Sequence, residues 1–318
     1  MLAVVTGGTG FVGQKLVARL IDRGDRVRVI SRRSHSIIGQ GNSPRYIQCD
    51  LSIANTSELS TFLDGADILF HCAGQLRNVS DMRALHVEGT RRLASAAQGH
   101  IKRWVQLSSV GVYGPVKRGI ISESSVFNPQ GEYERTKAES EMIVVEAAGR
   151  GGFEFSTLRP SNIYAPSMTN QSLYAMINMI SKGAFFYIGK SGAAANYIHV
   201  NNVIDGLLLC ASHDQASGHA FNISDTCNLE QFVDIISKKL GVVSPRLRLP
   251  EALVRFMVGA FGWVPNVPLT SSRVNALTTR AVYSTEKIET LLGYHPSVSI
   301  EAGLRDFVEH YLKVNSER

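Results

Sequence analysis

The chain has 318 residues, of which 44% are hydrophobic and 19% charged, so it can bury one large core or two smaller ones and is not intrinsically disordered. Its formal net charge of +6 suits an anionic cofactor or substrate, but the lysines and arginines are spread along the chain, which argues against nucleic acid as a partner. The four cysteines have no metal-ligand spacing, which predicts no metal site and reduced thiols in a cytoplasmic protein.

The N-terminus combines a short apolar run, Leu2–Val5, with three glycines spaced three apart, at Gly7, Gly10 and Gly13. A run this short, broken at once by glycines, does not match a signal peptide. It fits a buried parallel strand whose following turn lies so close to a pyrophosphate that side chains at the first two glycines would collide with it. The helix that opens near Phe11 directs free amide donors at the phosphates. The predicted dinucleotide site includes Gly7, Thr9, Gly10, Phe11, Val12 and Gly13.

The end of the second predicted strand, Arg26–Ile30, indicates which nicotinamide cofactor binds. An NAD site usually has an acidic residue there, which accepts hydrogen bonds from the ribose hydroxyls. This chain has Ser31, Arg32 and Arg33 instead. A guanidinium group can pair with a 2′-phosphate through two parallel hydrogen bonds, so NADP is favoured over NAD. If the two arginines form only a solvated loop pair, the preference is mixed.

Strand-like and helical segments alternate through the first half of the chain, which predicts right-handed βαβ units. The strands predicted after the first are Arg26–Ile30, Arg45–Cys49, Ile68–Ala73, Trp104–Ser108 and Glu154–Arg159. The predicted helices are Gln14–Arg23, Ser57–Leu63, Met82–Gln98 and Tyr133–Ala148. The fold class is therefore α/β, a doubly wound parallel Rossmann sheet with a smaller interleaved C-terminal substrate region.

Beyond Pro160 the alternation loosens into shorter, proline-punctuated helices. Strand Tyr197–Val200 and helix Asn202–Ala211 are expected to return to the sheet domain. The predicted division assigns 1–163 and 196–225 to a dinucleotide-binding domain, and 164–195 and 226–318 to a substrate-binding region. The apolar segment Ala252–Val264 falls short of the roughly twenty residues that span a bilayer. It is predicted to be a core or pocket helix, and the chain to have no stable membrane span.

Two segments carry the predicted chemistry. In LSSVGVYG a buried strand ends in two serines at the carboxyl edge of the sheet, where such folds bind ligands. Ser108 is expected to cap a turn, and Ser109 to hold the substrate oxygen. Tyr133 and Lys137 lie four apart in a predicted helix and so share one face. The neighbouring cation and the positive nicotinamide ring are both expected to favour the phenolate form of Tyr133, which moves its pKa toward useful acid–base work.

With these segments in place, the chain resembles the extended short-chain dehydrogenase/reductase family, also called the epimerase/dehydratase family, over nearly its full length. The matching motifs are TGGTGFVG, Cys49-Asp50-Leu51, His71-Cys72-Ala73-Gly74, LSSVGVYG, the Tyr133 and Lys137 pair, LRPSNIYAP and YIHVNNVIDG. The resemblance implies that Ser109, Tyr133 and Lys137 are the catalytic triad, with Lys137 also binding the nicotinamide ribose. It implies cofactor contacts at Asp50, Leu51, Cys72, Ala73, Gly74, Pro160 and Ile163, and substrate contacts at Ser109, Val110, Tyr133 and Asn162. It also implies a homodimer paired through Met82–Gln98 and Tyr133–Ala148.

The chain departs from the family pattern at two positions. Nucleotide-sugar enzymes of the family usually carry an arginine two residues before the aromatic of the YIHV strand, where it clasps the substrate pyrophosphate; here that position is Ala195. Arg273 or Arg280 could take over part of that role. The second departure is His86, where the family generally has an asparagine that supports a proton-relay water. His86 either relays protons itself or packs in a helix interface.

The predicted function is an NAD(P)-dependent oxidoreductase or epimerase that acts on a nucleotide sugar, with keto-sugar reduction ahead of epimerisation. Two alternatives stay open: a hydroxysteroid-like dehydrogenase of an apolar alcohol or ketone, and a non-catalytic NADP-binding sensor. A basic lining near Asn162 and Arg273 would favour the sugar nucleotide. A dry aromatic cavity under Phe256, Phe261 and Trp263 would favour the apolar ligand.

Overall fold

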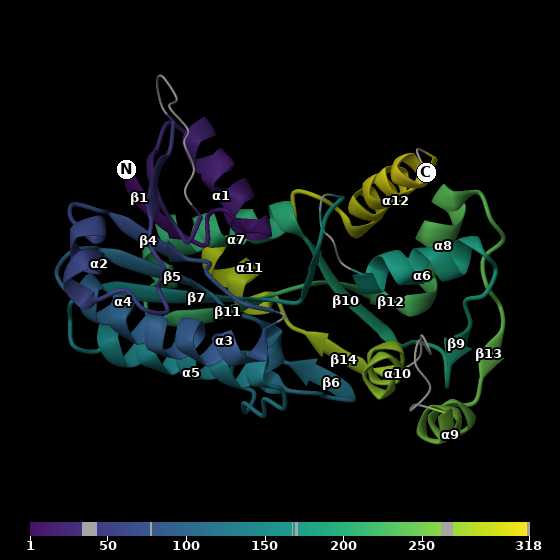
Figure 1. Cartoon of the computed structure of the whole chain (residues 1–318). Coiled ribbons are helices and arrows are strands. Elements are labelled where there is room, and N and C mark those ends of the chain that lie inside the picture. Colours follow the sequence, from purple (N-terminus) through teal and green to yellow (C-terminus); the bar gives the residue numbers. More distant parts are fainter. Residues whose placement is uncertain (34–42, 77, 167, 169–170, 262–269, 317–318) are drawn as a thin grey trace.

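The structure is a computed structural model that describes residues 1–33, 43–76, 78–166, 168, 171–261 and 270–316 (Figure 1). A sheet of seven parallel strands forms the larger part of the molecule, in the order β11-β7-β5-β4-β1-β2-β3. These strands are β1 (Leu2–Thr6), β2 (Arg26–Ser31), β3 (Arg45–Gln48), β4 (Ile68–His71), β5 (Arg103–Leu107), β7 (Glu154–Pro160) and β11 (His219–Ile223). The direction of chain progression reverses between β1 and β4, and such a reversal opens a ligand crevice at the carboxyl ends of the strands.

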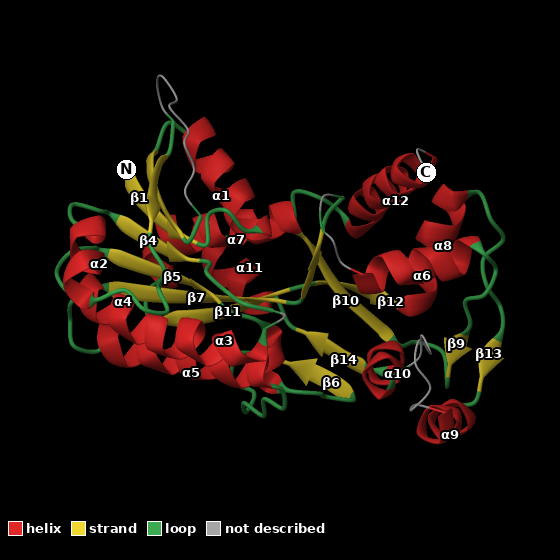
Figure 2. Cartoon of the chain, viewed as in Figure 1, coloured by secondary structure: helices red, strands yellow, loops and turns green. Residues whose placement is uncertain are grey.

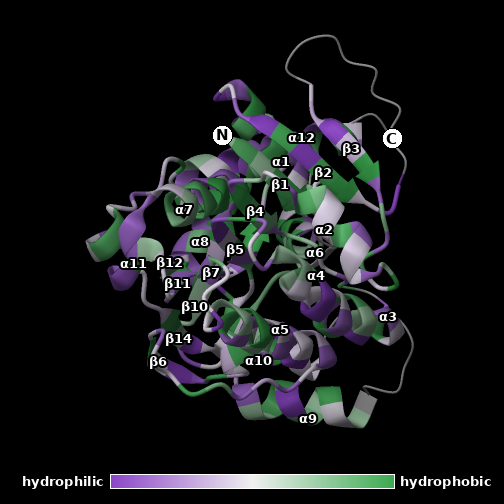
Figure 3. Ribbon diagram, turned by 90° about the vertical axis from the view of Figure 1, so that its left-hand side faces the viewer, coloured by the Kyte–Doolittle hydropathy of each residue, from purple (hydrophilic) through white to green (hydrophobic). Residues whose placement is uncertain are grey.

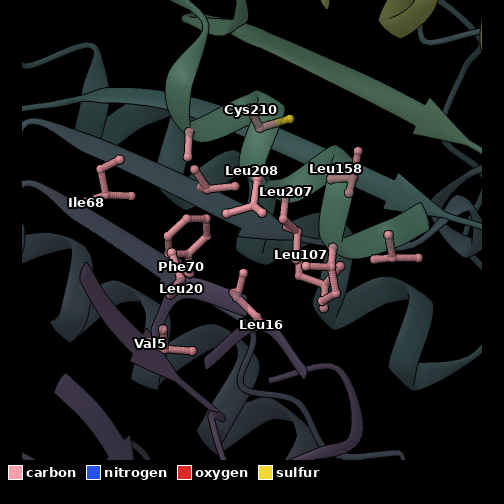
Figure 4. Close-up of a cluster of buried hydrophobic side chains, with 14 of the residues drawn as sticks. Val5, Leu16, Leu20, Ile68, Phe70, Leu107, Leu158, Leu207, Leu208 and Cys210 are labelled. Carbon is pink, nitrogen blue, oxygen red and sulfur yellow. The ribbon is translucent and has the colours of Figure 1, made fainter. Parts of the chain in front are cut away.

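Helices cover both faces of this sheet, so the predicted doubly wound α/β class is confirmed (Figure 2). One face carries α1 (Phe11–Asp22), α7 (Val200–Ser212) and α11 (Glu286–Leu292), and the other carries α2 (Thr56–Leu63), α4 (Thr90–Ala97) and α5 (Glu132–Ala148). Successive residues of β1 alternate between the two cores, because side chains along a strand point to opposite faces. Figure 4 shows the first core, where Leu16 and Leu20 of α1 and Leu207 of α7 meet Val5 and Phe70 of the sheet.

One predicted helix, Met82–Gln98, is divided into three segments of different helical type. It consists of α3 (Val79–Arg83), the π-helix η1 (Ala84–Gly89) and α4. Apolar spacing at a period of 3.6 cannot predict this, because a π-helix adds a residue to the turn without changing which residues are apolar. The π-helix is a local feature that often accompanies functional sites.

The smaller part of the molecule is built on a three-stranded sheet of order β12-β10-β8. Its elements are β8 (Asn162–Tyr164), β10 (Ala194–His199), β12 (Asp225–Asn228), α6 (Gln171–Ser181), α8 (Leu229–Leu240) and α12 (Ile300–Ser316), which share one hydrophobic core. Two short parallel pairs flank it, β9 (Tyr187–Ile188) with β13 (Arg248–Leu249) and β6 (Arg118–Ile121) with β14 (Arg280–Tyr283). The remaining elements are α9 (Glu251–Phe261), α10 (Ser271–Thr278) and the 3-10 turns η2 (Val110–Tyr113) and η3 (Asp214–Ala216).

The chain passes between the two parts several times, and some segments pack differently from their predicted assignment. Residues Ile288, Leu292 and Tyr294 belong to the core of the large sheet, although 226–318 was expected in the other region. Strand β10 pairs within the three-stranded sheet, whereas α7, which follows it directly, packs on the large one. Across the residues that the structure describes, none of the helices has the length and apolar character needed to cross a bilayer.

Candidate active site

The turn between β1 and α1 is closely packed against the end of β4. Gly7 has a φ of 68°, and a Cβ placed on it would lie 2.7 Å from the Cα and backbone nitrogen of Ala73. A Cβ on Gly13 would overlap the carbonyl oxygen of Gly7. The sequence argument assigned the need for glycine at position 7 to a pyrophosphate. The structure supplies a nearer reason, since the backbone after β4 already fills the space beside Gly7.

The first turn of α1 has the features of an anion site. Gly10 is its N-cap, so no side chain caps these amides within the described residues, and the turn contains no acidic residue. The backbone N–H groups of Phe11, Val12 and Gly13 therefore point out of the helix with its positive dipole end. This geometry fits a phosphate group of a dinucleotide.

The end of β2 carries the residues expected to select the cofactor. The buried Ser31 hydroxyl lies 3.1 Å from the Thr9 hydroxyl and accepts a hydrogen bond from the Arg33 backbone N–H. The side chains of Arg32 and Arg33 are exposed. Arg32 and Asp50 together line two adjoining cavities of about 200 and about 350 Å³. Arg32, which was predicted to bind the ribose phosphate, thus lines these two cavities.

The Asp50–Leu51 turn is fixed from two sides. Asp50 Oδ1 accepts hydrogen bonds from the backbone N–H and the hydroxyl of Ser52, at 2.9 and 2.7 Å. Arg92 of α4 donates to the carbonyl oxygens of Leu51 and Ser52. The turn therefore keeps its shape through contacts within the protein, and the buried Leu51 side chain belongs to the second core of the sheet.

The residues after β4 form the floor of the predicted cofactor trough. Ala73 is buried and its N–H donates to the Thr6 hydroxyl of β1 at 3.3 Å, while Cys72 is half-buried and Gly74 exposed. Burial raises the pKa of the Cys72 thiol to about 12, so this cysteine stays protonated near neutral pH. The trough thus lies where β1 and β4 meet, at the reversal in strand order.

Of the two serines at the end of β5, the one that caps the following turn is Ser109. Ser109 Oγ accepts a hydrogen bond from the Gly111 N–H at 3.1 Å and so caps η2. The Ser108 hydroxyl is buried and has no hydrogen-bond partner among the described residues. The expectation that Ser108 is the cap is wrong. Because Ser109 only accepts in its cap, its hydroxyl proton can still be donated to a ligand.

Tyr133 and Lys137 reach the same corner from the first turns of α5. The Lys137 ammonium is buried and donates to the carbonyl oxygen of Leu107 at 2.7 Å, two residues before Ser109. A Cβ placed on Gly111 would lie 2.9 Å from Glu134 Cγ and 3.3 Å from Ser109 Oγ. The start of α5 is therefore packed on the Ser109 turn, and the Lys137 ammonium lies at the end of β5.

The electrostatics at this corner differ from the prediction. The pKa of Tyr133 is raised to about 12, mainly by burial and further by the Glu134 charge. The pKa of Lys137 is lowered to about 8 by burial, and the Cys72 and Glu141 side chains oppose that shift. The protein groups alone therefore keep the phenol neutral, and the predicted lowering of the Tyr133 pKa by Lys137 is not observed. Burial, which disfavours the charged form of each group, is the main cause of both pKa shifts.

His86 lies buried in η1 with both ring nitrogens hydrogen-bonded. Nε2 is 2.8 Å from the backbone nitrogen of Gln75, and Nδ1 is 2.8 Å from the Thr136 hydroxyl of α5. Its ring also meets the ring of Tyr133 edge to face, with centroids 5.8 Å apart. Of the two alternatives for His86, packing in a helix interface is the one that these contacts describe.

The residues predicted to bind substrate are more scattered. Val110 and Pro160 are buried, Ile163 is half-buried, and the Asn162 side-chain amide donates to the Asn196 carbonyl at 3.1 Å. Arg273 lies in the first turn of α10. Arg280, at the start of β14, donates to the carbonyl oxygens of Lys190 and Ser191. Ala195 is buried in the core of the smaller part, so nothing at that position can bind an anion.

The apolar segment Ala252–Val264, predicted to be a core or pocket helix, is described as far as Phe261. It forms most of helix α9, one side of which is exposed to solvent. Among the described side chains of α9, only Val254 is fully buried, against Ile188 and Val274, while Phe256 is 72% exposed. Figure 3 shows hydrophobic and hydrophilic residues alternating along α9. Phe256 therefore does not line a dry cavity. Trp263 and the Phe261 side chain lie outside the described residues.

Sequence reasoning missed a buried network that holds α5 to the sheet. Arg159 of β7 donates to both carboxylate oxygens of Glu141 and to the Tyr113 hydroxyl, which in turn donates to Asn222. Thr136, the partner of His86, was missed as well. The available signals were an arginine inside the LRPSNIYAP motif and a threonine next to Lys137, but neither residue type predicts a partner by itself.

Comparison with known proteins adds to this geometry. A family model described as "NAD dependent epimerase/dehydratase family" matches residues 3–224. A 3beta-hydroxysteroid-dehydrogenase/decarboxylase, isoform 1 from Arabidopsis thaliana, is 24% identical over 99% of this chain and 80% of its own length. UDP-glucose 4-epimerase from Vibrio cholerae is 23% identical over 98% of this chain and 96% of its own length. The solved structure of UDP-glucuronic acid 4-epimerase from Bacillus cereus in complex with NAD is similar with a TM-score of 0.76 at 17% identity, covering 99% of both chains.

Proposed function

The chain belongs to the NAD dependent epimerase/dehydratase family, and from that membership we propose that Ser109, Tyr133 and Lys137 carry out NAD(P)-dependent oxidation and reduction at a carbon bearing a hydroxyl or keto oxygen. The single observation that carries the proposal is the Lys137 ammonium bonded to the carbonyl of Leu107. That bond places a lysine of α5 at the end of β5, beside the turn that holds Ser109.

Each side chain has a role that follows from its surroundings. The bound nicotinamide ring supplies or accepts the hydride. Ser109 donates its free hydroxyl proton in a hydrogen bond to the substrate oxygen and so orients the substrate. Tyr133, kept neutral by a pKa of about 12, gives its proton to the oxygen that becomes a hydroxyl during reduction. The Lys137 cation stabilises the phenolate that remains. A neutral phenol favours the direction of carbonyl reduction, in line with keto-sugar reduction ahead of epimerisation.

The proposed substrate is a nucleotide sugar. Asn162 on β8 and Arg273 on α10 are the polar side chains expected to meet such a ligand. The Vibrio cholerae relative, by its name, acts on UDP-glucose, and it matches this chain over nearly the full length of both. The outward orientation of Phe256 removes one wall of the apolar cavity that would have favoured another ligand.

An apolar alcohol or ketone is the second candidate, because of one specific position. Ala195 is buried among apolar side chains where nucleotide-sugar enzymes of the family usually have an arginine. The Arabidopsis thaliana relative is named as a hydroxysteroid dehydrogenase. An enzyme without that arginine needs another source of positive charge for a diphosphate, and an apolar substrate needs none.

For the cofactor we propose NADP ahead of NAD, on the side chains of Arg32 and Arg33. Their exposed guanidinium groups and the cavities beside Arg32 suit a 2′-phosphate. The Bacillus cereus structure contains NAD by its title, so NAD is the competing choice.

A ligand panel tests these assignments on the purified full-length chain. Consumption of NADPH and NADH is followed with keto-sugar nucleotides of uridine, guanosine and thymidine, and with steroid ketones. Thermal shift records binding in parallel, because a ligand that binds the folded state raises its stability. We expect turnover with a keto-sugar nucleotide and NADPH. Turnover with steroid ketones only would favour the second candidate. Cofactor binding without turnover of any carbonyl or alcohol would favour the NADP-binding sensor.

A further inference from the structure

His86 lies between the cofactor trough and the catalytic helix, and its hydrogen bonds have a direction. The Gln75 backbone N–H can only donate, so Nε2, which faces it at 2.8 Å, must be an unprotonated acceptor. In the neutral ring the proton is then on Nδ1, which donates to the Thr136 hydroxyl at 2.8 Å. The Thr136 hydroxyl in turn donates a hydrogen bond to the Glu132 carbonyl at 2.8 Å or to the Tyr133 carbonyl at 3.1 Å.

This chain of bonds leaves His86 no role as a proton carrier. A relay must accept a proton on one nitrogen and release one from the other. A proton on Nε2 would face the Gln75 N–H, so two donors would meet with no acceptor between them. The ring is also buried beside the Lys137 cation, and these two causes lower the pKa of His86 to about 3. Among the described residues, His71 and Tyr133 are also near it, and neither supplies a negative charge near neutral pH.

The same bonds connect three parts of the proposed active site. Gln75 directly follows Gly74 of the trough, and a Cβ on Gly74 would lie 3.7 Å from His86 Nε2. Thr136 lies between Tyr133 and Lys137 on α5. The His86 ring itself packs edge to face on Tyr133, at an interplanar angle of 78°. The His86 side chain thus contacts the backbone that follows the predicted trough, the Thr136 hydroxyl of α5 and the Tyr133 ring.

We propose that His86 is a positioning residue, held in the neutral Nδ1–H form, that aligns Tyr133 with the turn at Gln75 and transfers no proton. This inference rests on the proposed function of Tyr133. It replaces the water-relay role that the resemblance would assign to this position with a purely geometric one. Errors of about 1 Å in the placement of a reacting group can cost about a hundredfold in rate, so loss of this alignment should be measurable.

The protonation state can be measured without any substrate. Long-range 15N–1H NMR correlation on the labelled chain distinguishes the two neutral tautomers and the cation of each histidine, and the His86→Gln spectrum identifies the signal. We expect the Nδ1–H tautomer to persist between about pH 5 and pH 8, the range in which an ordinary histidine titrates. An Nε2–H tautomer, or a titration within that range, would overturn the proposal. This result stands even if the proposed role of Tyr133 fails.

Paired variants separate the two hydrogen bonds. In His86→Asn the side-chain amide can take the place of Nδ1 and keep the bond to Thr136. In His86→Gln the side-chain oxygen can take the place of Nε2 and keep the bond from the Gln75 N–H. Thr136→Val removes the hydroxyl and Thr136→Ser retains it. We expect Thr136→Val to lower kcat about tenfold with KM and the shape of the pH profile unchanged, and Thr136→Ser to restore kcat to within about twofold.

Chemical rescue distinguishes positioning from proton transfer. Free imidazole should not restore kcat to His86→Ala, because the missing function is alignment of Tyr133. Restoration by imidazole, or a Thr136→Val variant with unchanged kcat, would contradict the proposal. If His86→Ala does not fold, by circular dichroism and cofactor binding, the same rescue is applied to His86→Asn. Tyr133→Phe, measured in parallel, reports on the proposed function separately.

Discussion

At the residue scale, two of the three predicted catalytic side chains are held by backbone groups. The Lys137 ammonium is bonded to the Leu107 carbonyl, and Ser109 Oγ accepts from the Gly111 N–H. Backbone atoms at the end of a buried strand move little, so the positions of these side chains are set before a substrate binds. Such preorganisation lowers the entropic cost of reaching the reactive geometry.

The cofactor preference can be tested at Arg32 and Arg33. We expect the double variant Arg32→Ala/Arg33→Ala to weaken NADPH binding about tenfold and NADH binding by less than about twofold, since a hydrogen bond to a charged group contributes roughly 1.5–3 kcal/mol. Fluorescence titration of the reduced nicotinamide measures both affinities. The control is Arg305→Ala on α12, a charge removed from an exposed site. If the unmodified chain binds NADH more tightly than NADPH, the assignment of these arginines is wrong.

Because His71 is buried, we expect the stability of the protein to depend on pH in the acid range. Its nitrogens lie 2.7 and 3.0 Å from the hydroxyls of Thr6 and Thr90, and burial lowers its pKa to about 3. An unfolded histidine takes up a proton below about pH 6.5, whereas the folded one resists protonation until about pH 3. The unfolded state therefore binds more protons in this interval. The contribution of His71 to the free energy of unfolding is therefore complete above about pH 6.5, and it is lost as the pH falls from there toward about pH 3.

Denaturant unfolding of the unmodified chain and His71→Gln measures this contribution. Between about pH 7 and about pH 4.5 the stability advantage of the unmodified chain should shrink by about 3 kcal/mol, at about 1.4 kcal/mol for each pH unit. A pH-independent difference between the two proteins would show that His71 is not neutral and buried as described.

Single residues were predictable from sequence where their role depends on backbone shape, and less so where it depends on partners. The spacing of Gly7, Gly10 and Gly13 predicted the turn of β1 and α1, since only glycine fits there. The capping serine was misassigned because Ser108 and Ser109 differ in environment rather than in chemistry. The Tyr133 pKa was misjudged because burial, which a motif does not reveal, outweighs the charge four residues away.

At the scale of elements, the contact between α1 and the glycine turn should be sensitive to one methyl group. A Cβ on Gly13 would overlap the Gly7 carbonyl and lie 2.7 Å from the Gly8 Cα. We expect Gly13→Ala to destabilise the protein by about 1–3 kcal/mol and to weaken cofactor binding more than about tenfold, because α1 must move away from the turn. Thermal unfolding with and without NADPH measures both effects.

The matched control is Gly149→Ala at the end of α5. Gly149 has helical φ and ψ angles, and the nearest atoms to an added Cβ lie 3.4 Å away. That substitution should change stability by less than about 0.5 kcal/mol or raise it slightly, since alanine restricts the unfolded chain. Equal changes in stability at the two glycines would contradict the claim that the close contact at Gly13 requires glycine.

Most strands and helices of the large sheet were predictable, because βαβ units produce continuous apolar strands and periodic helices. The π-helix at Ala84–Gly89 was not, since the spacing of apolar residues does not distinguish it from an α-helix. The pairing of β10 with β8 and β12 was not predictable either, because strand partners of a short strand are chosen by packing rather than by its own sequence.

At the scale of the whole molecule, polar contacts join the two parts around the carboxyl edge of the large sheet. Asn202 of α7 donates to Asp225 of β12 and to the Val298 carbonyl, which precedes α12. The fold class followed from local patterns, but this arrangement depends on contacts between distant segments.

Self-association is predicted through the segments Met82–Gln98 and Tyr133–Ala148. Met142 and Val145 of α5 are 67% and 48% exposed, as expected of apolar residues that a second copy would cover. We expect Met142→Lys/Val145→Lys to convert a dimer into a monomer, because two buried charges per subunit would face each other. Light scattering coupled to size-exclusion chromatography gives the mass. Val243→Lys, at an exposed apolar residue following α8, should leave the dimer intact. A monomeric unmodified chain would contradict this prediction.

The most direct test of the central claim is the single-turnover rate of Tyr133→Phe with the keto-sugar nucleotide and cofactor that the unmodified chain uses. Phenylalanine retains the ring that packs on His86 but has no proton to give. The account predicts a rate at least about a hundredfold lower, the usual contribution of a general acid, with cofactor affinity within about twofold of the unmodified chain. An unchanged rate at unchanged affinity would contradict it, because the proton would then come from another group.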